Sequence, residues 1–374
     1  MSVSRVLIVG GGITGCVAAI ALAQRGVEVE LAEIRDEWGG AGHGITLQGN
    51  ALRSLRIIGV WDEVLAHGYP FDRVRLSRAD GSPIVEVPTP PTGGPELPPT
   101  LGSLRSDLQR ILVAAVYAAG IRVRLGVTIA QWSNHPSGLD VSFTDGTSGR
   151  YDLVVGADGI RSAIRSRLGI DTAPKPTGMS IWRVLADRSP QMTCSELFYE
   201  GPRYKAGYSP ISPTRVYAYL LDADTPQAGP GDRKPGAVLR ERAAGYAGRW
   251  GPIRDAITDD TPVNYQRIES LLVDDPWYRG RVVLIGDAVH ACPPLIAQGA
   301  AMCTEDAIVL AELVTGDRPV EQALKEFMRR RMARVRMVVE NSLLLADWEI
   351  HPDTPGADPA KIMATTLAAL QEPA

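Results

Sequence analysis

The sequence predicts an α/β protein with a parallel sheet, joined to a mostly antiparallel β domain and completed by a C-terminal helix. Three buried strand segments predict the parallel sheet, because each runs into a turn that contains glycine: "RVLIVG" at 5–10, "YDLVVGADG" at 151–159 and "RVVLIGD" at 281–287. Residues 178–268 alternate polar with apolar or aromatic side chains, which is typical of antiparallel strands. At 374 residues the chain is long enough for two domains.

The first segment carries the pattern Gly10-x-Gly12-x-x-Gly15 between a strand and a helix, "ITGCVAAIALAQRG". The first glycine allows the turn, the second lets a pyrophosphate approach the backbone, and the third lets the helix pack on the strand. The helix N-terminus favours an anion. A second strand, "VEVELAE", ends at Glu33, where an acid accepts hydrogen bonds from a ribose. These features predict a Rossmann-like dinucleotide-binding domain, but the pattern leaves FAD and NAD open.

Composition excludes several other classes of protein. The net charge is −4, so no broad basic surface is expected to bind nucleic acid. The apolar run "ILVAAVYAAGI" from Ile111 is far shorter than the roughly 20 residues of a membrane span, so no membrane partner is expected. The cysteines have neither Cys-x-x-Cys spacing nor a compact framework, which favours a cytoplasmic location without a metal site. They are Cys16, Cys194, Cys292 and Cys303.

The later segments end in Asp158-Gly159 and Gly286-Asp287, and each taken alone is compatible with an ordinary turn. In this order and spacing, the three segments resemble those of the single-component FAD-dependent aromatic hydroxylases, the p-hydroxybenzoate hydroxylase-like group A flavoprotein monooxygenases. Also matching are "GHGITLQGNALRSLRIIGV" at 42–60, "LRSDLQRIL" at 104–112 and Trp182-Arg183. The resemblance spans residues 3–345, and its middle part matches more loosely than the three motifs.

The resemblance implies an FAD site built from all three segments. Glu33 would hold the adenosine ribose, Asp287 would bind the ribityl chain, and Arg105 would contact the flavin. Asp158, with Arg161 and Arg165 nearby, would lie where flavin and nicotinamide approach. The full set of expected cofactor-binding residues is Gly10, Gly12, Gly15, Glu33, Arg35, Arg105, Asp158, Asp287, Pro294, Gln298, Gly299 and Ala300.

The helix that begins near Gln298 would aim its N-terminus at the flavin pyrimidine edge and stabilise negative charge there. Many relatives read Gly-Gln-Gly-x-Asn at this point, whereas this chain reads Ala297-Gln298-Gly299-Ala300-Ala301. The asparagine contact to flavin is therefore missing, although backbone N–H groups remain.

The function implied is that of an FAD-dependent monooxygenase that hydroxylates a small aromatic or heteroaromatic compound with O₂, through a flavin C4a-hydroperoxide. NADH or NADPH would bind transiently, because the chain has no second Gly-x-Gly-x-x-Gly unit. Alternatives are another flavin oxygenation, such as epoxidation or ring expansion, and a non-catalytic flavin-binding protein. An NAD-dependent dehydrogenase is disfavoured by the two later motifs. The expected state is a monomer or homodimer.

We expect a discontinuous FAD-binding domain over 1–70, 101–177 and 269–345, a substrate domain over 71–100 and 178–268, and a C-terminal tail over 346–374. Residues 71–88 predict a hairpin through Asp80-Gly81, and 88–100 predict a proline-rich surface loop or lid. Five arginines in "EFMRRRMARVR" at 326–336 predict a solvated or salt-bridged helix face.

Tyr217 and Tyr219 share one face of the strand "RVYAYL". Tyr217 is the candidate for a hydrogen bond to substrate, with Lys205 on the preceding strand as a partner for an anion or phenolate. The alternative is that the tyrosines pack the sheet and that Lys205 is solvated. His290 is expected to have a structural role, and His43 to lie near the flavin. No catalytic base is assigned.

Overall fold

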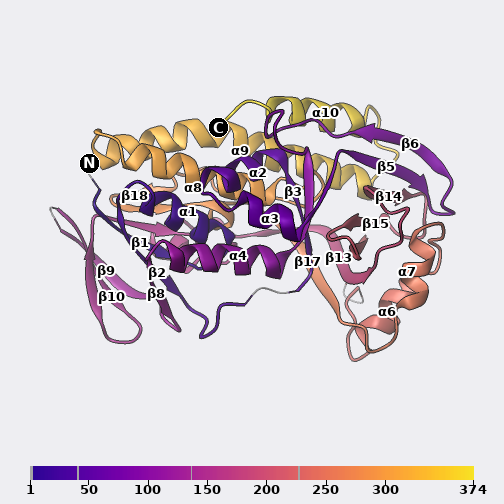
Figure 1. Ribbon diagram of the computed structural model, residues 1–374, viewed down its shortest axis with the longest axis horizontal. Coiled ribbons are helices and arrows are strands. Elements are labelled where there is room, and N and C mark those ends of the chain that lie inside the picture. Colours follow the sequence, from indigo (N-terminus) through magenta and orange to yellow (C-terminus); the bar gives the residue numbers. More distant parts are fainter. Residues whose placement is uncertain (1–2, 40–41, 136, 226–227) are drawn as a thin grey trace.

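The protein was analysed as a computed structural model, which describes residues 3–39, 42–135, 137–225 and 228–374. Two lobes lie side by side: a parallel sheet with its helices occupies one end of the molecule, and a large antiparallel sheet occupies the other (Figure 1). The long helix α9 (Val320–Ile350) runs along both lobes. The predicted α/β fold class is confirmed.

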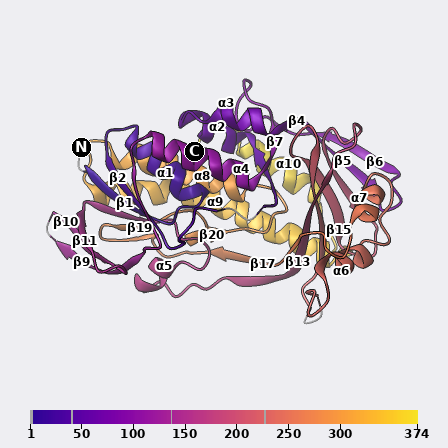
Figure 2. The ribbon, with the colours of Figure 1, turned by 60° about the horizontal axis from the view of Figure 1, so that its bottom comes forward.

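Within the described residues, the parallel sheet has the strand order β18-β19-β12-β1-β2-β8, in which only β18 is antiparallel to its neighbour. Helices α1, α4 and α8 lie on one side of this sheet, and a small antiparallel sheet of β9, β10 and β11 lies on the other (Figure 2). The strands are β1 Arg5–Val9, β2 Glu28–Glu33, β8 Arg122–Leu125, β9 Ile129–His135, β10 Gly138–Phe143, β11 Ser148–Tyr151, β12 Leu153–Gly156, β18 Tyr278–Arg279 and β19 Val282–Leu284. The helices are α1 Ile13–Ala23, α4 Arg105–Ala118 and α8 Gly299–Val314.

All three strands predicted from the glycine-containing segments are present, and they lie next to one another as β19, β12 and β1. Their side chains are almost entirely buried, as expected for strands covered on both faces. Because the strands are parallel, their carboxyl ends meet at one edge of the sheet. The turns after Val9, Gly156 and Leu284 are therefore brought together there.

The antiparallel lobe is a sheet of strand order β20-β17-β13-β16-β15-β14-β5-β6 in the described part of the chain. The predicted hairpin is present as β5 and β6. Two helices, α6 and α7, were not predicted; they are short and bury Leu239 and Trp250 beside the sheet. The elements are β5 Arg73–Arg78, β6 Pro83–Pro88, β13 Lys175–Asp187, β14 Ser195–Tyr199, β15 Lys205–Pro210, β16 Arg215–Ala223, β17 Val263–Leu272, β20 His290–Ala291, α6 Pro235–Arg242 and α7 Trp250–Ala256.

A small sheet of β3 (Gly44–Gln48), β7 (Thr100–Leu104) and β4 (Tyr69–Phe71) packs against the large sheet. The contact is close enough to require glycine, since a Cβ at Gly102 would lie 1.9 Å from the carbonyl oxygen of Pro210. Helices α2 (Gly49–Ile57) and α3 (Trp61–His67) follow β3. The small sheet thus places Gly44, the first residue of β3, against Tyr217 on β16.

One 3₁₀ turn and the helices α5 and α10 complete the described elements. A short 3₁₀ turn, η1 (Gly286–Ala288), follows β19, and α5 (Ala163–Arg167) follows β12. Helix α9 continues past position 346, where the sequence analysis placed the start of a tail, and α10 (Pro359–Ala369) packs against it with Leu367 buried. The proposed division into domains remains a prediction.

Candidate active site

The glycine turn after β1 has the geometry that its sequence predicts. Gly10 has φ +107°, and a Cβ at Gly15 would lie 1.9 Å from the carbonyl oxygen of Gly10. Gly15 therefore permits α1 to pack closely on the turn. Gly12, at the N-terminus of α1, is exposed, and a Cβ there would meet nothing within 4 Å. The helix N-terminus thus opens onto free space, as an approaching phosphate requires.

The side chain of Glu33 is held against this turn at the end of β2. Its carboxylate accepts hydrogen bonds from the backbone N–H of Gly11 at 2.7 Å and of Arg35 at 3.0 Å. Trp38 and Gln109 donate to the carbonyl oxygen of Gly11 at 2.9 and 2.8 Å. The sequence analysis did not identify these two residues. The side chain of Arg35 is exposed beside them.

The second acidic residue, Asp287, lies in η1 close to the N-terminal part of α1. A Cβ at Gly286 would lie 2.8 Å from the hydroxyl oxygen of Thr14. The Asp287 side chain remains in contact with solvent, but the protein around it removes part of its hydration. Burial raises the pKa of Asp287, whereas His290 and Arg105 lower it. The charge of Arg105, at the start of α4, thus acts on this carboxylate although the two residues are far apart in the sequence.

Asp158 follows β12, and its carboxylate is occupied within its own turn. It accepts hydrogen bonds from the hydroxyl of Ser162 at 2.5 Å and from the backbone N–H of Ile164 at 3.1 Å. The buried Arg165 donates to the carbonyl oxygen of Ala288 at 2.8 Å. These bonds fasten the Asp158 turn to η1.

The N-terminus of α8 follows a loop in which Pro294 is exposed but Ile296 is buried. Ala297 has φ +54°, a left-handed conformation in which glycine is less strained, and it stands where many relatives have glycine. Gln298 is fully buried, and its side-chain oxygen accepts a hydrogen bond from Asn50 at 3.0 Å. The Gln298 Nε2 has no partner among the described residues. Gly299 and Ala300 begin the helix.

On the large sheet, Arg183 of β13 organises a polar group. It donates through Nε to the hydroxyl oxygen of Tyr217 at 3.0 Å, and through a terminal nitrogen to Asn264 at 3.2 Å and Gln266 at 2.6 Å. His43 lies close by, and its pKa falls to about 4 because of burial and the charges of Arg183 and Arg105. The sequence analysis named Trp182-Arg183 as a matching motif but gave Arg183 no role.

The structure places Lys205 and Tyr217 on the same face of the sheet, but it gives Lys205 a different partner. The Lys205 ammonium group is buried and pairs with the carboxylate of Glu349 on α9. Tyr219, the other tyrosine of the strand, has its ring 5.4 Å from that of Tyr217 and is only partly buried. The sequence predicted this shared face because Tyr217 and Tyr219 lie two residues apart on one strand.

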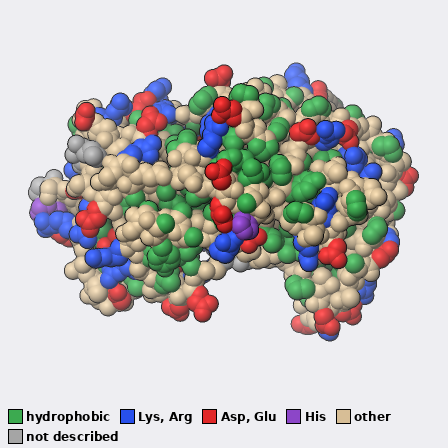
Figure 3. All heavy atoms as spheres, viewed as in Figure 1, with side chains coloured by type: hydrophobic (Ala, Val, Ile, Leu, Met, Phe, Trp, Pro, Cys, Tyr) green, Lys and Arg blue, Asp and Glu red, His purple; other side chains and the backbone are tan. Residues whose placement is uncertain are grey.

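These residues form a continuous path across the junction of the two lobes. It runs from Glu33 and Gly12 past Asp287 and Arg105 to Arg183 on the large sheet. Charged side chains, a histidine among them, gather around the notch between the lobes (Figure 3). The path offers an acid for a ribose, a free helix N-terminus for a pyrophosphate and an unpartnered donor at Gln298. Its residues therefore fit FAD.

Other features of the described residues do not compete with this path. No group of His, Cys, Asp and Glu within the described ranges could hold a metal ion. A separate surface hollow of about 490 Å³, whose lining includes Gly26 and Arg122, lies at the start of β2 and β8, away from Glu33. Among the helices that the structure describes, none is long and apolar enough to cross a membrane.

The fold and this path define a dinucleotide-binding flavoprotein, and comparisons with known proteins agree. The FAD binding domain family model matches residues 3–342. The 2-heptyl-3-hydroxy-4(1H)-quinolone synthase of Pseudomonas aeruginosa is 34% identical over 92% of this chain and 90% of its own. The 3-amino-4-hydroxybenzoate 2-monooxygenase of Streptomyces cremeus is 30% identical over 94% of this chain and 89% of its own. The chain belongs to this family of FAD-dependent monooxygenases.

Solved structures show the same fold over nearly the whole chain. The 2-methyl-3-hydroxypyridine-5-carboxylic acid oxygenase superposes with a TM-score of 0.81 at 25% identity, covering 98% of this chain and 96% of the other. A variant of Klebsiella pneumoniae HpxO in complex with FAD has a TM-score of 0.81 at 25% identity, covering 98% and 94%. The resemblance inferred from the three motifs is thus confirmed, and so is FAD as the cofactor.

Proposed function

We propose that this FAD-dependent monooxygenase hydroxylates a small aromatic or heteroaromatic compound with O₂ and with NADH or NADPH. The substrate would bind on the face of the large sheet around Arg183 and Tyr217. The observation that carries the proposal is the arginine-rich group of Arg183, Arg105 and His43 at the end of the cofactor path. One relative is named for a hydroxyquinolone product and the other for an aminohydroxybenzoate substrate, and both are aromatic compounds that carry oxygen substituents.

The cofactor-binding residues are proposed to be the set expected from the sequence. Gly10, Gly12 and Gly15 would admit the pyrophosphate. Glu33 would accept hydrogen bonds from the adenosine ribose, and Asp287 from the ribityl chain. The remaining members would contact the cofactor along the same path and are Arg35, Arg105, Asp158, Pro294, Gln298, Gly299 and Ala300. Bound FAD would supply the redox chemistry, since NAD(P)H can reduce it and its reduced form can activate O₂.

The protein's own side chains would bind and orient the substrate. The hydroxyl oxygen of Tyr217 accepts its hydrogen bond from Arg183, so the Tyr217 proton is left to be donated to a substrate oxygen. Burial raises the pKa of Tyr217, so this proton is retained at neutral pH. Arg183 would place positive charge beside a phenolate or carboxylate. Lys205, whose charge is balanced by Glu349, would contribute to the pocket wall.

The N-terminus of α8 would act on the cofactor side of the pocket. Its free N–H groups and dipole favour negative charge, which is the charge that a flavin gains on reduction. The unpartnered Nε2 of Gln298 would add a further donor at this position. The cytoplasmic location and the monomeric or homodimeric state remain predictions.

The test is aerobic oxidation of NADH and NADPH by the purified yellow protein, with a panel of phenols, hydroxybenzoates, hydroxypyridines and quinolones. We expect one group of compounds to stimulate oxidation and to gain one oxygen atom, with the position assigned by NMR. Flavin bound without any stimulated oxidation across the panel would favour the non-catalytic alternative. NMR evidence of an epoxide or an expanded ring would favour another oxygenation.

A matched variant tests the substrate site itself. Tyr217→Phe removes one hydrogen-bond donor from the pocket, so substrate-stimulated turnover should fall roughly tenfold, the effect of one lost hydrogen bond. The FAD content should stay unchanged. If turnover and substrate binding are both unaffected, Tyr217 only packs the sheet.

A further inference from the structure

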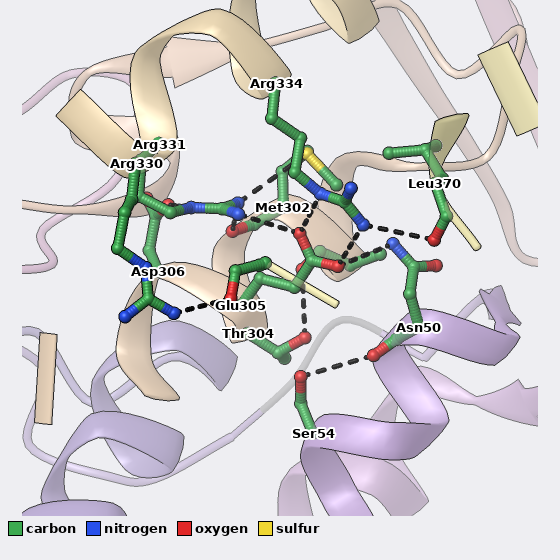
Figure 4. Close-up of polar contacts among 12 residues, drawn as sticks. Asn50, Ser54, Met302, Thr304, Glu305, Asp306, Arg330, Arg331, Arg334 and Leu370 are labelled. Atoms are coloured by element: carbon green, nitrogen blue, oxygen red, sulfur yellow. Dashed lines mark hydrogen bonds and ion pairs between the residues drawn. The ribbon is translucent and has the colours of Figure 1, made fainter. Parts of the chain in front are cut away.

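A buried ionic network joins α2, α8 and α9 (Figure 4). It lies next to two segments proposed to face the flavin, the Gly286–Ala288 turn and the start of α8. We call it the α8–α9 network, and it consists of Asn50, Glu305, Asp306, Arg331 and Arg334. The sequence analysis expected all five arginines of "EFMRRRMARVR" on a solvated or salt-bridged face. All five arginines form ion pairs, as the second of these possibilities expected, but Arg331 is 0% exposed and lies at the centre of the network.

One arm of the network reaches the turn that carries Asp287. Arg331 donates through Nε to one carboxylate oxygen of Asp306 at 2.7 Å. The other Asp306 oxygen accepts a hydrogen bond from the backbone N–H of Gly286 at 2.9 Å and contacts His290 Nε2 at 2.6 Å. Asp306 thereby holds the residue immediately before Asp287. The structural role predicted for His290 is found here.

The other arm reaches the start of α8. Arg331 donates to Glu305 at 2.9 Å, and the second oxygen of Glu305 accepts a hydrogen bond from Asn50 at 3.1 Å. The same Asn50 amide donates to the side-chain oxygen of Gln298 at 3.0 Å. This bond orients the Gln298 side chain, so that its unpartnered Nε2 points away from Asn50.

The packing of α8 on α9 does not by itself require buried charged side chains. Well-packed apolar residues often replace a buried ionic group with no loss of stability. Apolar side chains, however, cannot make directional bonds to two separate turns. Burial alone would raise the pKa of both carboxyls, but His290 and Arg331 at Asp306, and Arg331 and Arg334 at Glu305, bring each below its usual value. Both remain charged acceptors.

We propose that Arg331 is a positioning residue that sets both the Gly286–Ala288 turn and the start of α8, and so controls how the flavin half of FAD is held. The inference rests on the placement of FAD given above. The adenosine half is held independently, because Gly11 is hydrogen-bonded to Glu33, Trp38, Gln109 and Cys16, which lie outside the network.

The two halves of FAD can be tested separately, because ADP contains the adenosine and the pyrophosphate but neither the ribityl chain nor the flavin ring. Arg331→Lys keeps the positive charge but loses the planar fork that bonds to two carboxylates at once. We expect its Kd for FAD to rise at least roughly tenfold, while its Kd for ADP stays within about twofold. The matched control is Arg329→Lys on the same helix, where the side chain is exposed and, among the residues that the structure describes, bonds to Glu326 alone. It should change neither constant.

A second variant, Asn50→Leu, removes the amide that joins Glu305 to Gln298, together with its contact to the Thr92 hydroxyl. It leaves Glu305 paired with Arg53, Arg331 and Arg334. It should weaken FAD binding and make the midpoint potential of the bound flavin more negative, because the donors at α8 are less well aimed. Equal losses of FAD and ADP affinity in both variants would show a general structural role and overturn the proposal. Unchanged FAD affinity and potential would overturn it as well. If ADP fails to displace FAD from the wild type, the placement of the adenosine is wrong. The FAD affinity and the midpoint potential of the flavin in the variants then still test whether the network positions the flavin half.

Discussion

The glycine turn after β1 allows its two proposed purposes to be separated with a pair of alanine variants. At Gly15 a Cβ would lie 1.9 Å from the Gly10 carbonyl oxygen, whereas ordinary contacts are about 3.5 Å. Helix α1 would have to move by more than 1 Å where it packs on a buried strand. We expect Gly15→Ala to lower the free energy of unfolding by about 3 kcal/mol, near the upper end of overpacking costs.

At Gly12 the same substitution meets nothing within 4 Å and keeps an ordinary backbone, with φ −73°. Gly12→Ala should therefore cost less than about 1 kcal/mol of stability, the scale of a weaker N-cap. It should nevertheless weaken FAD binding roughly tenfold or more, because the new methyl group occupies the space into which the pyrophosphate approaches.

The assays are denaturant unfolding of the FAD-free variants and titration of each with FAD, followed by flavin fluorescence. A Gly12→Ala protein that binds FAD as the wild type does would show that the pyrophosphate does not approach this residue. A Gly15→Ala protein of undiminished stability would refute the packing argument. Loss of both properties in both variants would mean that the two purposes are not separable.

Three further predictions concern other positions. Glu33→Ala should raise the Kd for FAD roughly tenfold in the same titration, while Glu28→Ala, at the other end of the same strand, should not. His43 has a pKa of about 4 in the folded protein and an ordinary value near 6.5 when unfolded, so the unfolded chain gains the proton first as pH falls. Wild-type stability should thus fall between pH 6.5 and 4 by about 1 kcal/mol more than that of His43→Gln, measured by denaturation at both pH values. Ala297→Gly should raise the free energy of unfolding by about 0.5–1 kcal/mol, because relief of the left-handed strain exceeds the added entropy of the unfolded chain; a destabilised variant would contradict this.

The cofactor half of the site was predictable because its signals are local. A glycine at a strand end, a helix of small residues and an acid at the end of the next strand occupy fixed places in one βαβ unit. Gly10, Gly15 and Glu33 accordingly have the geometry expected from their order in the chain. The three strand ends could be placed together because parallel strands share an edge.

The substrate half depends on pairs that the sequence does not relate. Lys205 and Glu349 are 144 residues apart, and no local pattern links them. Arg183 and Tyr217 are joined only because β13 and β16 pair in one register. Arg331 was placed with its neighbours on a solvated or salt-bridged face, because a charged residue is assumed to be solvated unless its partners are known.

The length of α9 constrains how molecules enter and leave the site. Its 31 residues span about 46 Å, and the helix contacts α8 in one lobe and β13 and β17 in the other. Because this helix is stiff and packs on both lobes, it holds them together. They cannot rotate apart about a hinge unless the helix detaches from one of them. Passage of substrate and product would then rely on local movements of the chain and not on separation of the lobes.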